Sequence, residues 1–216
     1  MSDLAQRRRE EKERRRDEIL AAALKVAGLV GIDALTMDQV ARQARLSRAL
    51  IYVYFTDKDD LLFALCERVL VQLAAAFREA TRGAATGRDR LAAMGAAYVA
   101  FSQQEPVSFD VLARCEARDS ASLPKGGNAE ACLARGDEVH GVLVQVLHEG
   151  VRDGSIRASL TQADAVATAL WGFMHGVIQI AATKGALLER RGVGPDMLFQ
   201  QALHLALAAV APTPDA

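Results

Sequence analysis

The chain has 216 residues, of which 51% are hydrophobic and 25% are charged, and its formal net charge is −1. This length provides a substantial core and corresponds to one domain of ordinary size, or to a small domain attached to a larger one. The first sixteen residues are basic and polar, with no apolar run behind them, so we expect no secretion signal and a cytoplasmic protein. Cys66, Cys115 and Cys132 are widely spaced and form no CxxC pair, which indicates reduced, buried thiols and argues against a disulfide framework or a metal site.

Charge is distributed unevenly along the chain. Residues 1–58 hold 12 Lys and Arg against 9 Asp and Glu, whereas residues 59–216 hold 14 against 18. A basic front on an acidic body indicates a polyanionic partner for the front alone. Within the arm of residues 1–16, interleaved glutamates favour a salt-bridged helix for Arg14 to Arg16. Two interpretations stay open for Arg7 to Arg9, which either are solvated or follow a minor groove.

Almost every segment shows helical periodicity and none alternates as a strand, so we predict an all-α chain. Thr36, Ser47 and Asp57 are the expected N-caps of the second, third and fourth helices. Pro195 lies in the first turn of the last helix. Nine helices are expected, at about residues 10–30, 36–44, 47–54, 57–81, 88–104, 107–117, 129–153, 161–183 and from 195, with a flexible loop at 120–130 and a frayed tail at 211–216.

One segment is long and apolar enough to require a membrane check. Residues 165–182 carry no formal charge, a length close to that of a spanning helix. Thr168, His175 and Gln179 interrupt it, and no basic loop flanks it on one side. We therefore expect a helix buried within a protein bundle, covered on more than one side, and no membrane partner.

Residues 36–54 meet the demands of a helix-turn-helix. Val40, Ala41, Ala44, Leu46 and Ile51 are apolar where the two helices must pack, and a short turn at residues 45–47 separates them. Arg45 falls where a left-handed backbone favours glycine, at a cost of about 1 kcal/mol. A contact of Arg45 with a phosphate would offset that cost. The pattern alone also fits an ordinary helical hairpin with a solvated outer face.

The segment that follows decides between these two interpretations. "YVYFTDKDDL" resembles the Y-x-[YH]-F-x-x-K-x-x-L signature of the TetR family of bacterial transcriptional regulators, and the similarity covers about residues 19–65. The resemblance implies a three-helix DNA-binding head at residues 1–57 on a larger helical body at residues 58–216. The body of such a protein dimerises and holds a small-molecule effector, and the free dimer usually represses genes nearby. The sequence departs from the family pattern at Arg45, Leu50 and Val53, so no operator sequence can be borrowed from another member.

The head supplies two kinds of candidate DNA contact. Arg48 is the candidate base-reading residue, because its guanidinium can bridge guanine O6 and N7, and Leu50 and Val53 can lie against thymine methyl groups. The remaining candidates face the phosphate backbone or the exposed side of the second helix. They are Thr36, Arg45, Ser47, Ala49, Tyr52, Tyr54 and Lys58. Capping alone also explains Thr36 and Ser47, and both tyrosines also fit a structural role.

The body supplies candidates for pairing and for effector binding. Small and apolar residues share one face of each of the last two long helices, which predicts a four-helix dimer interface; intrachain packing is the alternative. These residues are Ala169, Gly172, Gly176, Leu198, Ala202, Leu205, Ala206 and Ala209. Apolar and aromatic stripes, which core packing also explains, predict an effector cavity with a polar handle at Tyr98 or His175. The stripes contain Met94, Tyr98, Phe101, Phe109, Cys115, Trp171 and His175.

The segment "LWGFMHG" also resembles a Trp-His-Gly stretch of one TetR effector-domain subgroup. The greasy character of the stripes favours an acyl chain or a hydrophobic aromatic compound as effector. Two other function classes compete with a regulator, namely an enzyme and a protein-interaction adaptor. The sequence contains no Ser/His/Asp set, no paired metal ligands and no phosphate-cradling loop, so we expect no catalytic residue, no metal and no cofactor. Salt-dependent binding to duplex DNA separates the regulator from both.

Overall fold

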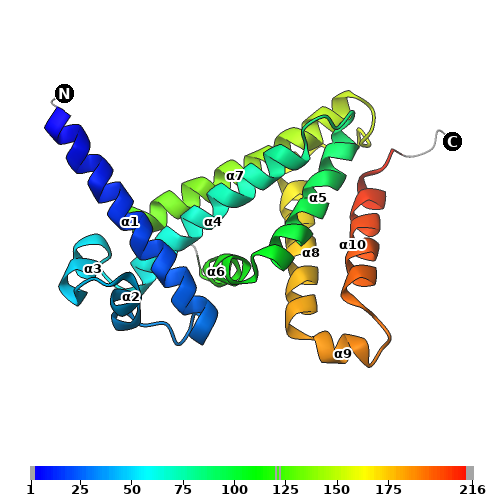
Figure 1. Ribbon diagram of the computed structural model, residues 1–216. Helices are drawn as coiled ribbons and strands as arrows, with labels where there is room; N and C mark the ends of the chain where they lie inside the picture. Colours follow the sequence, from blue (N-terminus) through cyan, green and yellow to red (C-terminus); the bar gives the residue numbers. More distant parts are fainter. Residues whose placement is uncertain (1–2, 120, 122, 213–216) are drawn as a thin grey trace. The chain divides into compact units, whose positions relative to one another are not determined.

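The structure, a computed structural model, describes residues 3–119, 121 and 123–212. The described residues form helices and no strands, which confirms the predicted all-α class (Figure 1). The helices are α1 (Asp3–Val30), α2 (Met37–Ala44), α3 (Arg48–Tyr54), α4 (Lys58–Ala80), α5 (Gly87–Gln104), α6 (Pro106–Glu116), α7 (Gly127–Arg152), α8 (Ala163–Thr183), α9 (Gly185–Glu189) and α10 (Pro195–Val210).

Most helix limits lie close to the prediction, and two differ for local reasons. The first helix begins at Asp3 and not near residue 10, because side-chain pairs three and four residues apart, such as Gln6–Glu10 and Arg14–Glu18, support the early turns. The five-residue α9 was not predicted, since one turn is too short to show a periodicity. Residues 120, 122 and 213–216 of the expected loop and tail lie outside the described residues.

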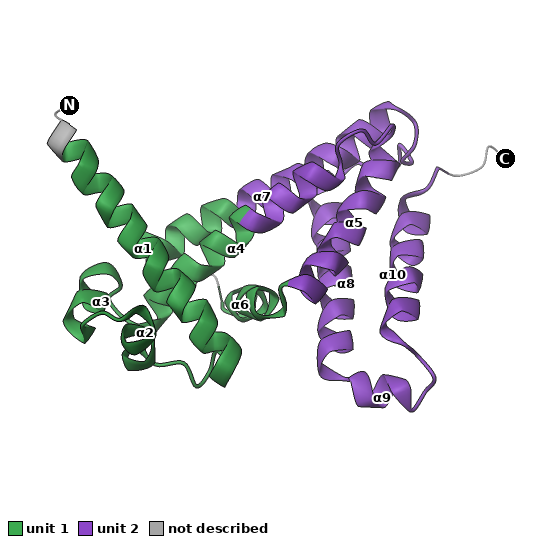
Figure 2. Cartoon of the chain, in the orientation of Figure 1, with its two compact units in different colours: residues 1–71, 105–135 green, residues 72–104, 136–216 purple. Residues whose placement is uncertain are grey.

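The chain divides into two compact units (Figure 2). The first unit contains Met1–Val71 and Glu105–Arg135, and the second contains Gln72–Gln104 and Gly136–Ala216. Both α4 and α7 therefore contribute to each unit. The predicted boundary after residue 57 separates functions and stays a prediction.

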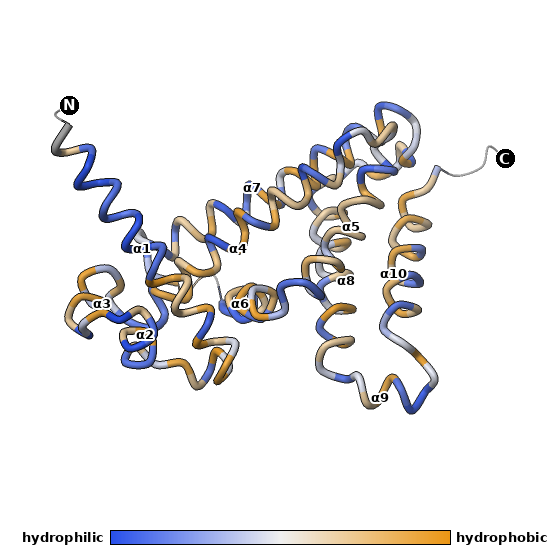
Figure 3. The backbone as a smooth tube through the Cα atoms, in the orientation of Figure 1, coloured by the Kyte–Doolittle hydropathy of each residue, from blue (hydrophilic) through white to orange (hydrophobic). Residues whose placement is uncertain are grey.

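The core of the first unit is built where α1 packs on α2 and α6. Figure 3 shows that the early turns of α1 are hydrophilic and that apolar residues dominate its later turns. The large side chains of this core are fully buried, which is what fixes α2 and α3 on the rest of the unit. They are Ile19, Leu20, Leu35, Val40, Ile51, Phe55, Leu61 and Leu65.

The second unit is built on α5, α8 and α10, and α10 packs on both of the others. The backbones of α5 and α7 meet closely at Gly87, where a Cβ atom would lie 2.2 Å from the backbone nitrogen of Gly150. Only glycine fits that approach. The Asp153 carboxylate accepts the Gly87 N–H at 2.7 Å, and Arg90 pairs with Glu149, so polar contacts fix the same crossing.

The coverage of α8 differs from the prediction. Only 17% of its most apolar window is buried in the single chain, so the expectation that the chain covers it on more than one side is wrong. The buried face consists of Ala163, Ala167, Met174 and Ile178. Length and composition alone would allow α8 to cross a membrane, a property that core and interface helices share. The chain thus leaves a broad apolar face of α8 without a cover.

Candidate nucleic-acid interface and effector site

Thr36 caps α2 through a reciprocal pair of hydrogen bonds. The Gln39 N–H donates to Thr36 Oγ1 at 3.3 Å, and the Thr36 N–H donates to Gln39 Oε1 at 2.8 Å. This capping box satisfies two of the amide groups that a helix start leaves open, and it confirms the predicted cap. Ser47 caps α3 in the same way, since its Oγ accepts the Leu50 N–H at 3.2 Å. The free amides beside both caps point in the direction in which an anion binds.

The turn between α2 and α3 depends on Arg45. Its backbone is left-handed, with φ 57° and ψ 40°, and among the described residues it is the only non-glycine with positive φ. The Leu46 N–H donates to the Ala41 carbonyl at 2.9 Å, and the Arg45 N–H donates to the Arg42 carbonyl at 3.2 Å. These two bonds form a Schellman motif that ends α2 and turns the chain into α3. The predicted left-handed position is confirmed, and the contact of Arg45 with a phosphate stays a prediction.

A buried seam holds α3 on α2, and the opposite side of α3 is open. Val40 and Ile51 have no exposed surface, and Ala41 is 4% exposed. On the open side Val53 is 71% exposed and Tyr52 is 41% exposed. Ala49 is also exposed, and Leu50 is half-buried. A helix seated on one face and open on the other can enter a major groove.

Arg48 lies on this open side but already has partners. Its Nε is 3.0 Å from Asp38 Oδ1, and its guanidinium lies 5.6 Å from the ring centre of Tyr52. Its hydrogen bond with Tyr52 and then the nearby Asp38 raise the pKa of Arg48. Asp38 was not among the predicted site residues, because an acidic side chain gives no signal for contact with a polyanion. The pair holds Arg48 against the surface of α2 and α3.

Lys58 is engaged inside the unit. Its Nζ donates to the carbonyl oxygen of Asp33 at 2.7 Å, so the first residue of α4 fastens the loop between α1 and α2. Tyr54 is half-buried at the end of α3. Asp57 caps α4 as predicted, since its Oδ1 accepts the Asp60 N–H at 2.8 Å. The predicted phosphate contacts of Lys58 and Tyr54 remain predictions beside these structural roles.

The end of α6 and the start of α7 are tied to the same region of the first unit. Arg114 pairs with Asp33, and Arg118 pairs with Asp59 at 2.6 Å, which lowers the pKa of the Asp59 carboxyl through their hydrogen bond. Asn128 of α7 donates to Asp60 Oδ1 at 2.8 Å. Movement of α6 or α7 would therefore reach the start of α4 directly.

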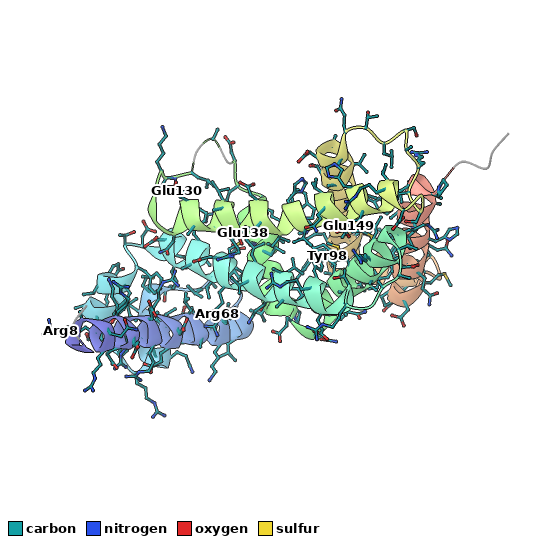
Figure 4. All side chains as sticks on the ribbon, turned by 90° about the horizontal axis from the view of Figure 1, so that it is seen from above. Arg8, Arg68, Tyr98, Glu130, Glu138 and Glu149 are labelled. Carbon is teal, nitrogen blue, oxygen red and sulfur yellow. The ribbon has the colours of Figure 1, made fainter. Side chains whose placement is uncertain are left out.

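The basic arm is the helical beginning of α1. Arg14 pairs with Glu11 and Glu18, and Arg16 pairs with Glu67, as the salt-bridge interpretation predicts. Arg7, Arg8 and Arg9 are exposed, and Arg8 lies near the start of α1 (Figure 4). A helix about 10 Å wide does not fit a minor groove about 6 Å wide, so their route into a groove would require side chains alone or unwinding.

The structure brings three of the predicted effector residues together in the second unit. Tyr98 Oη lies 2.7 Å from His175 Nδ1, and the rings of Trp171 and His175 are 6.1 Å apart. Burial lowers the pKa of His175, so the imidazole is neutral in this pair. Phe77, which was not predicted, meets Tyr98 edge-on at 6.1 Å. Figure 4 shows Tyr98 within α5.

The other predicted effector residues lie elsewhere. Met94 and Phe101 of α5 are 3% and 7% exposed and belong to the core of the second unit. Phe109 and Cys115 are on α6 in the first unit, where Phe109 is buried. A cavity between α7 and α8 leaves about 10 Å³, room for one water molecule, and none of the predicted effector residues lines it.

The predicted dimer residues differ in how the single chain covers them. Ala169, Gly172, Leu205 and Ala209 are exposed, and Gly176, Leu198 and Ala206 are half-buried. Ala202 is 3% exposed, so intrachain packing already covers it. A Cβ atom added at Gly172 or Gly176 would meet nothing within 4 Å, which means that no element of this chain uses the close approach these glycines permit.

Comparison with known families places both parts of the chain. Residues 19–65 match "Bacterial regulatory proteins, tetR family", and residues 91–206 match "Tetracyclin repressor-like, C-terminal domain". The HTH-type transcriptional regulator HbdR of Aromatoleum sp. (strain CIB) is 47% identical over 58 residues, 27% of this chain and 25% of HbdR. The regulator BetI of Rhizobium meliloti (strain 1021) is 40% identical over 80 residues, 37% of this chain and 39% of BetI. The chain therefore spans well under half the length of these curated relatives.

Solved structures share the fold over nearly the whole chain. A protein with unknown function from Rhodococcus sp. RHA1 has a TM-score of 0.73 and 26% identity, covering 91% of this chain and 95% of that one. FadR from Bacillus subtilis in complex with stearoyl-CoA has a TM-score of 0.70 and 19% identity, covering 89% and 98%. Because the second family match alone, at residues 91–206, spans more than half of the 216 residues, this chain belongs to the TetR family of bacterial transcriptional regulators.

Proposed function

We propose that this regulator is a homodimeric repressor that binds a palindromic double-stranded operator and leaves it when a small hydrophobic effector binds. The observation that carries the proposal is the state of α3. Its inner side is fixed by a seam in which Val40 and Ile51 are fully buried, and its outer side presents Arg48, Tyr52 and Val53 to solvent. A rigid helix with an open basic and apolar face is what reading a major groove requires.

The head, which we assign to residues 1–57, divides the work between anchoring and reading. The capped starts of α2 and α3 at Thr36 and Ser47 supply amide groups and a positive dipole end for phosphates. Arg48 supplies the base contact, after exchanging Asp38 for a guanine edge. Both members of that ion pair are more than half exposed, so water screens it and the exchange costs little.

The body, which we assign to residues 58–216, supplies the pairing surface. On α8, Ala169, Gly172 and Phe173 are exposed and face away from the buried side of the helix. Leu205 of α10 is 58% exposed. A second copy packing on these two helices would cover apolar surface that the single chain leaves in water, which is the main favourable term in association.

The effector is proposed to be an acyl compound or a small aromatic compound. The Tyr98–His175 pair is a polar handle among apolar side chains, and it sits beside the ring of Trp171. Such a pair can hold one polar end of an otherwise greasy molecule. The printed complex of the FadR structure with stearoyl-CoA supports testing acyl compounds first.

Selection of bound duplexes from a random pool tests the DNA-binding part of the proposal. We expect a palindrome whose half-sites are centred about one helical turn or a multiple of it apart. A reporter gene placed behind the selected sequence then distinguishes repression from activation. A selected pool without any shared sequence would contradict the proposal, as would activation of the reporter for its repressor part.

A further inference from the structure

All three cysteines of the chain meet in the core of the first unit, although they come from three helices. Cys66 is on α4, Cys115 on α6 and Cys132 on α7. The Cys115 thiol donates to the carbonyl oxygen of Leu62 at 3.8 Å, one turn of α4 before Cys66. Asn128, one turn of α7 before Cys132, is bonded to Asp60 of α4. Each of the three thiols has hydrogen-bonding contact with the other two.

Packing alone does not explain this convergence well. One buried cysteine behaves as a small apolar side chain, and such a residue is common in cores. Here the only three cysteines among 216 residues share one place, at distances that permit chemistry between them. Among the residues that the structure describes, no group of three or more His, Cys, Asp and Glu side chains is arranged to hold a metal ion. The cluster therefore fits reactions between thiols better than metal binding.

The charges around the cluster favour one thiolate. Hydrogen bonds from Cys115 and then from Cys66 lower the pKa of the Cys132 thiol, because S–H donors stabilise the thiolate. The same contacts raise the pKa of Cys115 to about 12. Burial, and then the charge on Cys132, raise the pKa of Glu116 to about 8, so that this carboxyl is protonated near neutral pH and adds no second negative charge.

Access to the cluster differs between its members. Cys66 is 2% exposed and Cys132 is 7% exposed, whereas Cys115 is half-buried and opens toward the surface. A molecule the size of hydrogen peroxide can reach the cluster past Cys115 with a small opening of the packing. The thiolate of Cys132 and the partly exposed thiol of Cys115 then occupy the positions of an attacking and a resolving cysteine.

We propose that Cys132 and Cys115 form a redox pair that hydroperoxides convert into a disulfide between α7 and α6. The Cys132 thiolate attacks one peroxide oxygen and forms a sulfenic acid, while the other oxygen leaves as water after taking a proton. The Cys115 sulfur then attacks the sulfenic sulfur, and its thiol proton leaves with the hydroxyl group as a second water. Two thiols and one hydrogen peroxide thus give one disulfide and two waters, and Cys66 stays reduced.

The disulfide would act on the DNA-binding head within the same unit. Arg118 follows Cys115 by less than one turn and pairs with Asp59 in the first turn of α4, and Asn128 binds Asp60 beside it. Drawing α6 and α7 together would change these contacts and, through α4, the loop that Lys58 fastens. This regulatory step rests on the proposed DNA-binding function, and we expect oxidation to lower operator affinity about tenfold.

The reduced full-length protein would be treated with hydrogen peroxide and digested without reducing agent, and its peptides would be weighed. We expect the loss of two hydrogen atoms and a cross-linked peptide pair containing Cys115 and Cys132. Cys115→Ala and Cys132→Ala should abolish the cross-link. Cys66→Ala is the matched control and should keep it. Thermal unfolding checks each variant, and Cys115→Ala, the least buried change, decides the matter if Cys132→Ala fails to fold.

The two parts of the inference fail separately. Thiols that stay reduced in the folded protein but react after unfolding would show that the cluster is inert packing. A disulfide that forms without any change in operator affinity would overturn the regulatory step. Since the peptide masses do not depend on DNA, a chain that never binds duplex would refute the proposed function and leave the redox pair standing.

Discussion

Two apolar residues of α3 that are two positions apart should respond to truncation in opposite ways. Ile51 has no exposed surface and fills the seam between α2 and α3, whereas Val53 is 71% exposed on the outer side. Ile51→Ala removes buried methyl and methylene groups and leaves a cavity, which costs about 2–5 kcal/mol of unfolding free energy. Alanine is the better helix former at both positions, so a few tenths of a kcal/mol offset that loss. Val53→Ala loses almost no buried surface, and its unfolding free energy should stay within about 0.5 kcal/mol.

Urea unfolding of the two variants measures this difference, and duplex selection measures its functional counterpart. Ile51→Ala should weaken binding to every duplex alike, because α3 is no longer seated. Val53→Ala should keep the fold and change the preferred base at one position of each half-site, since its methyl groups then no longer contact thymine. Equal destabilisation by both substitutions would refute the assignment of an inner and an outer side to α3.

Four further outcomes are expected. Arg48→Ala should relax base choice at one position of the half-site; uniform weakening with a flatter salt slope would make Arg48 a phosphate contact. Arg45→Gly should raise the unfolding free energy by up to about 1 kcal/mol in urea titrations, because glycine adopts the left-handed turn without strain, and any loss of stability argues against this. Leu205→Glu should give a folded monomer in sedimentation, whereas an intact dimer would remove α10 from the interface. Trp171→Ala should change the effector response and spare ligand-free DNA binding; the reverse pattern would place Trp171 in the scaffold.

The parts of the molecule that local interactions determine were predictable. Thr36, Ser47 and Asp57 cap helices as the sequence indicates, because a cap involves residues only two or three positions apart. The left-handed turn at Arg45 follows equally from the length of the connection and the start of the next helix. The seam at Val40 and Ile51 follows from apolar spacing on two helices.

The parts that depend on packing between distant segments were not predictable. The sequence separates Cys66, Cys115 and Cys132 by dozens of residues, and no spacing rule brings three such thiols together. The partner of Arg48 is Asp38 on another helix, a contact that only the packing of α2 on α3 creates. The exposure of α8 was mistaken for the same reason, because composition shows that a helix is apolar and does not show which chain covers it.

The central claim is that α3 and its neighbours bind duplex DNA through phosphates and select a sequence through bases. Binding of the full chain to its selected duplex and to a scrambled duplex, measured over a range of salt concentrations, tests this claim most directly. We expect affinity for both duplexes to fall steeply and in parallel as salt rises, since the same phosphates are neutralised, with the selected duplex bound at least about a thousandfold more tightly. Affinities that are independent of salt, or equal for the two duplexes, would contradict the account.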